Sequence, residues 1–234
     1  MMTDPGQWIE GWLSTLRFAV YLDAAGGDRG RALALYEWNA RAAAAFHHDL
    51  GHLEVALRNA YDRALRHRDE SEARHWVFDP SRHFPIQEER ARNGVVVDAN
   101  DKPRAQIEQA IRSARRDTKG RAPTPPGKVI AELRFGFWRY LTIARRTDAL
   151  RIPYLRTAFR PGTDRRDVDH PVGRLHLLRN RVAHNEPLIR MDLAGRHADV
   201  LTVAGLMAVP LRDHLTDLSP VQAVLKEWPA YLTR

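Results

Sequence analysis

The chain has 234 residues, enough for one domain with its own hydrophobic core, and it carries 37 lysines and arginines against 29 aspartates and glutamates. The net charge of +8 and the isoelectric point near 10.3 favour a polyanionic partner such as nucleic acid, although an arginine-rich composition can also arise without one. The absence of cysteine excludes disulfides, thiolate metal sites and a cysteine nucleophile, and no apolar stretch reaches the roughly 18 residues that span a bilayer.

At the N-terminus, the first ten residues lack the basic and apolar segments of a secretion signal, so we expect a cytoplasmic protein. Further along, hydrophobic side chains recur at spacings of three and four, the repeat of one face of an α-helix. In chain order, the segments expected to be helical are 8–22, 31–66, 86–92, 102–116, 128–150, 172–186, 197–215 and 220–226. The pattern predicts an all-α helical bundle without internal repeats.

Glycine and proline are expected to separate these helices. The breaks are predicted at Gly26-Gly27-Asp28, the connector 75–85, Asn93-Gly94, the proline-rich linker 122–127 and the basic loop 156–169. Within helices, Gly51 could bend or split the long second one, and Pro210 should kink or divide the penultimate one. Three valines at 95–97 could form a short strand. We therefore expect a single domain over 1–234 with an accessory insertion around 70–125.

A polar segment near the end of the 172–186 helix is the main candidate for a reactive site. It contains Arg179, Asn180 and His184 in the run RNRVAHNEPL. An arginine followed five positions later by a histidine is weak evidence alone, because a chain with 37 basic residues and 11 histidines contains ~1.7 such basic–histidine pairs by chance. A second pair, Arg165 and His170, falls in the predicted loop. The context of each pair must therefore show whether it marks a reactive site.

The periodicity of this helix places the polar residues beside a buried face. One stripe about 120° wide holds its apolar residues, Val172, Leu175, Leu178 and Val182. Arg179 lies at the edge of this stripe, followed round the helix by His176, Asn180 and His184. Arg179 and His184 are about 140° apart and about 7.5 Å apart along the axis, so they do not stack. Either the arginine reaches across or a second subunit completes the site, and Pro187 should end the helix nearby.

The run Arg-Asn-x-x-x-His followed by Asn-Glu-Pro-Leu resembles the signature of the HEPN superfamily (higher eukaryotes and prokaryotes nucleotide-binding), and most closely its Abi-like branch, linked to abortive infection. The segments 36–39, 53–59 and 132–138 resemble other segments of that branch, in the same order. The resemblance spans about 12–190. It implies an all-helical HEPN-type fold, a homodimer, and a toxin-like endoribonuclease without metal or cofactor, held in check by an antitoxin or regulatory protein during phage defence.

Cleavage of RNA by its own 2′-hydroxyl needs few side chains from the protein. The hydroxyl attacks the adjacent phosphorus and leaves a cyclic phosphate. His184 would transfer the proton, as base or as acid, because an imidazole titrates near neutrality. Arg179 would stabilise charge on the phosphoryl oxygens, and Asn180 would orient the imidazole or bind the phosphate. His176 is a further candidate on the same arc, and Arg181 is a candidate for RNA binding.

Other polar residues have two interpretations each. Glu54 and Arg58 have the spacing of an ordinary helical ion pair, but the resemblance makes Arg58 and Asn59 candidates for lining the site, with Glu54 as a supporting residue. His48 and His52 have the spacing of two metal ligands on one helical face, but no third or fourth ligand follows at a recognisable spacing, so no metal site is predicted.

Two alternatives to a ribonuclease stay open. One is a non-catalytic module that binds RNA or a partner, and the other is a plain helical interaction protein whose polar segment merely caps a helix end. The arginines of the 156–169 loop could likewise clamp an RNA backbone or simply be solvated. Aromatic residues Phe135, Phe137 and Trp138 are expected to be mostly core, not base-stacking, groups.

Overall fold

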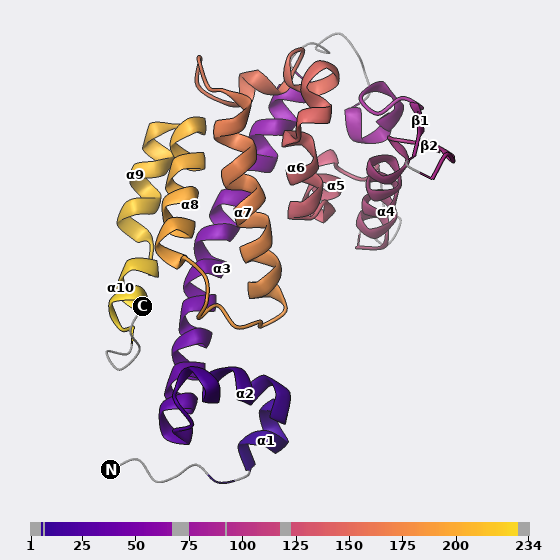
Figure 1. Cartoon of the computed structure of the whole chain (residues 1–234). Coiled ribbons are helices and arrows are strands. Elements are labelled where there is room, and N and C mark those ends of the chain that lie inside the picture. Colours follow the sequence, from indigo (N-terminus) through magenta and orange to yellow (C-terminus); the bar gives the residue numbers. More distant parts are fainter. Residues whose placement is uncertain (1–5, 7, 67–74, 92, 118–122, 229–234) are drawn as a thin grey trace.

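One long helix, α3 (Arg29–Arg66), runs through the molecule, and α2, α6, α7, α8 and α10 pack along it (Figure 1). Gly26 and Gly27 have positive φ values of 63° and 85° and form the predicted break before it. The Asp28 carboxylate then accepts a hydrogen bond from the backbone N–H of Arg31 at 2.8 Å, which caps the new helix. The helix continues through Gly51 without a division, because the buried residues on either side hold both halves against the same core.

The structure is a computed structural model that describes residues 6, 8–66, 75–91, 93–117 and 123–228. Its other elements, in chain order, are α1 (Trp8–Leu13), α2 (Thr15–Ala24), the short turns η1 (Trp76–Phe78) and η2 (Pro80–Arg82), β1 (Glu88–Arg90), β2 (Val96–Asp98), α4 (Asp101–Asp117), α5 (Pro126–Glu132), α6 (Phe135–Thr142), η3 (Ala144–Arg146), η4 (Thr147–Arg151), η5 (Leu155–Ala158), α7 (Arg165–Ala183), α8 (Leu193–Met207), α9 (Val209–Leu218) and α10 (Val221–Lys226). The predicted all-α class is confirmed. None of the described helices combines the length and apolarity needed to cross a membrane.

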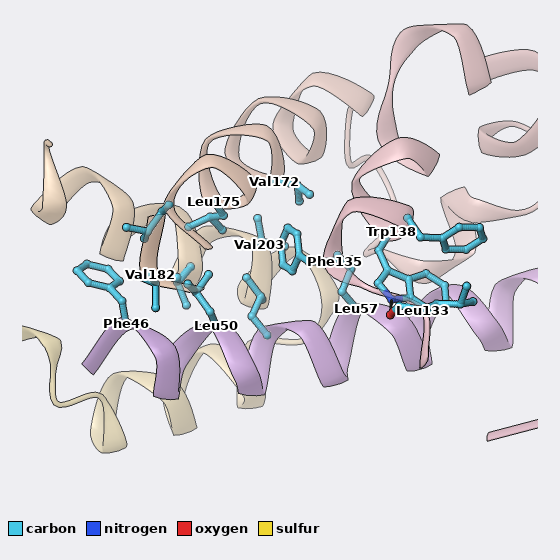
Figure 2. Packing of buried hydrophobic residues seen from close by; sticks show 14 of the residues in the cluster. Phe46, Leu50, Leu57, Leu133, Phe135, Trp138, Val172, Leu175, Val182 and Val203 are labelled. Carbon is cyan, nitrogen blue, oxygen red and sulfur yellow. Dashed lines mark hydrogen bonds between the residues drawn. The ribbon is translucent and has the colours of Figure 1, made fainter. Parts of the chain in front are cut away.

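The core lies where α7 packs between α3, α6 and α8 (Figure 2). The predicted apolar stripe of α7 faces this core, and its members Val172, Leu175, Leu178 and Val182 are all buried. Phe135 from α6 and Val203 from α8 close the space above α3 in the same view. The predicted core role of the aromatic segment is also confirmed, since Phe135, Phe137 and Trp138 are all buried.

The helix α7 begins seven residues earlier than predicted. Asp164 caps it by accepting from the backbone N–H of Arg166, while Asp167 accepts from the backbone N–H of Asp164. The predicted loop 156–169 therefore contributes its last residues to the helix. Arg165, expected to be a loop arginine, instead pairs with Asp169 at 2.6 Å.

The predicted helix over 86–92 is wrong. Residues 88–90 form strand β1, which pairs antiparallel with β2 through a turn at Gly94, where φ is 80°. Asp98 stabilises the base of this hairpin by accepting from the backbone N–H groups of Gln87 and Asn100 and from the side chain of Arg104. The short strand predicted at 95–97 is present, one residue further along, within the segment expected to be an accessory insertion.

Three other predicted helices are divided. At 8–22 the break is at Ser14, whose φ is 64° and whose hydroxyl accepts from the backbone N–H of Arg17. At 197–215 the break is at Ala208, just before Pro210, as predicted, and the helix α8 that precedes it begins at Leu193. At 128–150, Leu133 and Arg134 are extended and separate α5 from α6. The break between α5 and α6 turns the N-terminus of α6 towards α3.

The connection after α7 is held by a buried amide. Asn39 of α3 accepts a hydrogen bond of 2.6 Å from the backbone N–H of Leu188, and both residues are buried. We expect Asn39→Ala to lower the free energy of unfolding by about 1–3 kcal/mol, because a buried N–H loses its acceptor. Urea denaturation measures this loss. Glu37→Ala, on the exposed face of the same helix, is the control and should change stability by less than about 0.5 kcal/mol; equal losses for both variants would contradict the assignment.

Candidate functional site

Three helices meet at Glu54. Its half-buried carboxylate, on α3, lies close enough to the backbone N–H of Phe135, the first residue of α6, for that N–H to lower its pKa. Arg134, at the N-cap position of α6, makes no side-chain capping bond. Burial raises the pKa of Glu54, and the positive charges of Arg179 and Arg58 oppose the rise.

His176 of α7 packs against the same end of α6. Its ring stacks on Phe135, with centroids 6.1 Å apart and an interplanar angle of 4°. Its Nε2 lies 3.4 Å from the side-chain nitrogen of Asn180 and would lie only 3.3 Å from a Cβ at Gly136, so a larger residue there would push the ring aside. Burial lowers the pKa of His176, and the positive charges of Arg139 and Arg179 lower it further.

An ion-pair network fixes α6 against α7, one turn along α6 from Phe135 and two turns along α7 from His176. Asp169 of α7 pairs with Arg139 of α6 at 2.5 Å and with Arg165 at 2.6 Å, and it accepts from the Thr142 hydroxyl at 3.2 Å. A Cβ at Gly173 would lie 3.1 Å from the Arg139 guanidinium, so this glycine permits the close approach. The network is largely enclosed, and it holds α6 in the register that places Phe135 on His176.

Arg179 is half-buried beside these groups and forms no ion pair within 4.0 Å among the described residues. Its charge acts on both Glu54 and His176, which places the guanidinium near both. Arg58 is also near Glu54 without a direct ion pair in the described part of the chain, so the helical pair expected from its spacing does not form. An arginine without a carboxylate partner is available to bind an anion such as a phosphate.

His184 does not belong to this cluster within one chain. It is the exposed C-cap residue of α7, and its backbone N–H bonds to the carbonyl of Asn180. Asn185, with φ at 52°, turns the chain away, and Arg181 donates to the carbonyl of Pro187 at 3.0 Å instead of entering the site. The Asn180 side chain contacts His176, not His184 as its spacing allowed.

A surface groove of about 390 Å³ extends from the C-terminal end of α7 along α3. Its lining residues among those described are Tyr36, Asn39, Ala40, Ala43, Ala44, His47, Val182, Ala183 and Asn185. His47 connects this groove electrostatically to Glu54, two turns along α3. Arg17 of α2 donates to the carbonyl of Asn185 at 2.9 Å at the α7 end of the groove. The groove therefore lies between α2 and the stretch of α3 that leads to Glu54.

The structure thus brings five of the predicted residues into one cluster, namely Glu54, Arg58, His176, Arg179 and Asn180, and leaves Asn59, Arg181 and His184 exposed outside it. The sequence did not identify three residues that belong to this cluster or hold it in place, namely His47, Phe135 and Arg139. His47 shares the helical face of Glu54 at a spacing of seven, which was a usable signal. Nothing in the sequence paired Arg139 with Asp169.

No metal site accompanies this cluster in the described residues, which contain no group of three or more side chains suited to hold an ion. His48 and His52 pack edge-to-face with ring centroids 4.7 Å apart, and His48 bonds to the buried carboxylate of Asp49. The arrangement can bind an anion at Arg179 and exchange protons at His176, His184 or Glu54.

Comparison with known proteins gives no relative. No family model matches the chain, and no curated protein and no solved structure matches it.

The geometry of the cluster predicts how His176 titrates. Its imidazole midpoint in NMR titrations should lie below the ordinary 6.5, and Arg179→Gln should raise it, because one nearby positive charge that disfavours the imidazolium is removed. Arg181→Gln removes the same charge two residues away on the exposed face and should leave the midpoint in place. Equal shifts in both variants would mean that Arg179 is not beside His176.

Proposed function

We propose that the chain is a metal-independent endoribonuclease of the HEPN type, Abi-like branch, and that Arg179 binds the reacting phosphate. The observation that supports this most is the half-buried Arg179, which has no carboxylate partner in the part of the chain that the structure describes and lies near Glu54 and His176 at the junction of α3, α6 and α7. The net charge of +8 would attract RNA to the surface. We further propose cytoplasmic RNA as the substrate.

The proposed reaction removes one proton from the attacking 2′-hydroxyl and delivers one proton to the leaving 5′-oxygen. The 2′-hydroxyl loses its proton to a base and forms a bond to the adjacent phosphorus, and the bond from phosphorus to the 5′-oxygen breaks as that oxygen takes a proton from an acid. The products are a 2′,3′-cyclic phosphate and a 5′-hydroxyl. Arg179 stabilises the added charge on the phosphoryl oxygens. His184 serves as base or acid, and His176 or Glu54 is placed to serve as the other group.

We propose a homodimer that brings His184 of one copy to Arg179 of the other. Within one chain His184 lies on the exposed end of α7, outside the cluster that holds Arg179. The adjacent groove is lined by Ala40, Ala43, Ala44 and Ala183, small residues that permit close approach of a second backbone. An antitoxin or other regulatory protein that covers this surface would keep the enzyme inactive.

Cleavage of single-stranded RNA by purified protein tests the activity. We expect His184→Ala to reduce the rate by about 100- to 10,000-fold, because a proton-transfer group is lost. Arg179→Ala should cost about 100- to 1,000-fold through lost phosphate stabilisation. EDTA should change nothing. The controls are His214→Ala and Arg212→Ala on the exposed surface of α9, and a wild-type rate no higher than that of His184→Ala would refute the enzyme assignment.

Mixing two inactive variants tests the dimer. If Arg179 and His184 of different copies form one site, a mixture of Arg179→Ala and His184→Ala chains should recover about a quarter of the wild-type rate, because half the dimers are mixed and each mixed dimer has one intact site of two. If both residues act within one chain, every site in the mixture lacks one of them and no activity returns.

A second candidate function is a non-catalytic RNA-binding module. The position of His184 outside the cluster favours it, since Arg179 can bind a phosphate without that residue. In that case the protein would bind RNA with an affinity that depends on Arg179, and no variant would alter RNA integrity.

A further inference from the structure

A second groove, of about 570 Å³, lies between α4 and the corner where α5 meets α6. Figure 1 shows α4 and α7 on opposite sides of α5 and α6, and the packing of α4 on α5 and of α6 on α7 agrees with that view. The described lining residues are Asp101, Lys102, Ala105, Gln106, Gln109, Ala110, Ser113, Glu132, Leu133, Arg134 and Phe137. Its volume is typical of sites that enclose a small organic molecule.

The lining has the chemistry of a nucleobase site. The apolar part of the lining that faces solvent is Ala105, and the buried Leu133 and Phe137 close the groove behind it. Gln106 and Ser113 are half-buried on the α4 wall and make no side-chain hydrogen bond within the described chain. The side-chain carbonyl of Gln109 accepts a hydrogen bond from the Arg112 side chain at 3.0 Å, so the NH₂ group of Gln109 is left to donate. Amide and hydroxyl groups of this kind recognise base edges.

Two cationic side chains line the same groove. Lys102 and Arg134 both line it, are exposed, and form no ion pair with the described residues. Arg134 directly precedes Phe135, whose ring stacks on His176 of the polar cluster. The N-terminus of α6 therefore separates the two sites and touches both. A strand whose phosphate lies at Arg179 can pass this helix end and enter the groove, with its backbone beside Arg134.

We propose that this groove binds an unpaired base of the RNA strand whose phosphate is held at Arg179; the inference rests on the proposed function. Glu132, half-buried in the lining and without an ion pair among the described residues, accepts a hydrogen bond from an exocyclic amino group. Adenine, cytosine and guanine carry such a group and uracil does not, so the groove disfavours uracil. An extended peptide is the competing occupant, and the binding experiment below separates the two.

Fluorescence anisotropy of a labelled single-stranded RNA decamer, bound to the full chain carrying His184→Ala to prevent cleavage, tests the proposal. Ala105→Trp should fill the groove and weaken binding by about tenfold or more, and Gln106→Ala by about fivefold through a lost hydrogen bond. Gln222→Ala, on the exposed face of α10, is the matched control and should bind as the parent does. Oligouridine should bind more weakly than oligocytidine, and Glu132→Gln should reduce that difference.

The outcomes separate this inference from the proposed function. If the wild type cleaves RNA but Ala105→Trp binds the decamer as tightly as the Gln222→Ala control, the groove proposal is wrong and the ribonuclease stands. If no RNA is cleaved but Ala105→Trp and Gln106→Ala weaken binding, the groove proposal stands and the enzyme does not. A groove that serves a peptide would leave decamer binding unchanged in both groove variants, which overturns the proposal. Circular dichroism of each variant confirms that it folds.

Discussion

The placement of the half-buried Glu54 carboxylate of α3 beside the N-terminus of α6 shapes the candidate site. The first N–H groups of a helix lack partners within it, and its dipole favours a negative charge there, so a carboxylate satisfies both needs at once. Phe135, the first residue of α6, stacks on His176, and Arg179 and Asn180 are half-buried nearby on α7. A carboxylate, an imidazole and a guanidinium that has no ion pair among the described residues are consequently gathered at one place.

The parts of the fold that depend on local patterns were predictable. The apolar stripe of α7 follows from spacing alone, and the break before α3 follows from two glycines and an aspartate cap. The same spacing also showed that Arg179 and His184 cannot stack on one helix, which the exposed C-cap position of His184 now illustrates. Resemblance pointed to Arg58 and Asn59 as residues that line the site; Arg58 is near Glu54, and Asn59 is exposed outside the cluster.

Features set by contacts distant in sequence were not predictable. Helical periodicity runs on through 128–150 in the sequence, yet Leu133 and Arg134 are extended and divide α5 from α6. The strand at 88–90 exists because Asp98 binds backbone groups across the hairpin, which no local propensity reveals. The side chain of Asn180 turns to His176 because Phe135 and Gly136 hold that ring in place, a consequence of the α6 position.

We propose that this cluster promotes cleavage of RNA by the RNA's own 2′-hydroxyl, without a metal. The chemical nature of the product ends tests it most directly, because the mechanism fixes them. Mass spectrometry of a short RNA incubated with the protein in EDTA should show a 2′,3′-cyclic phosphate on one fragment and a 5′-hydroxyl on the other. Fragments that carry a 5′-phosphate and a 3′-hydroxyl, or an RNA left intact, would contradict it.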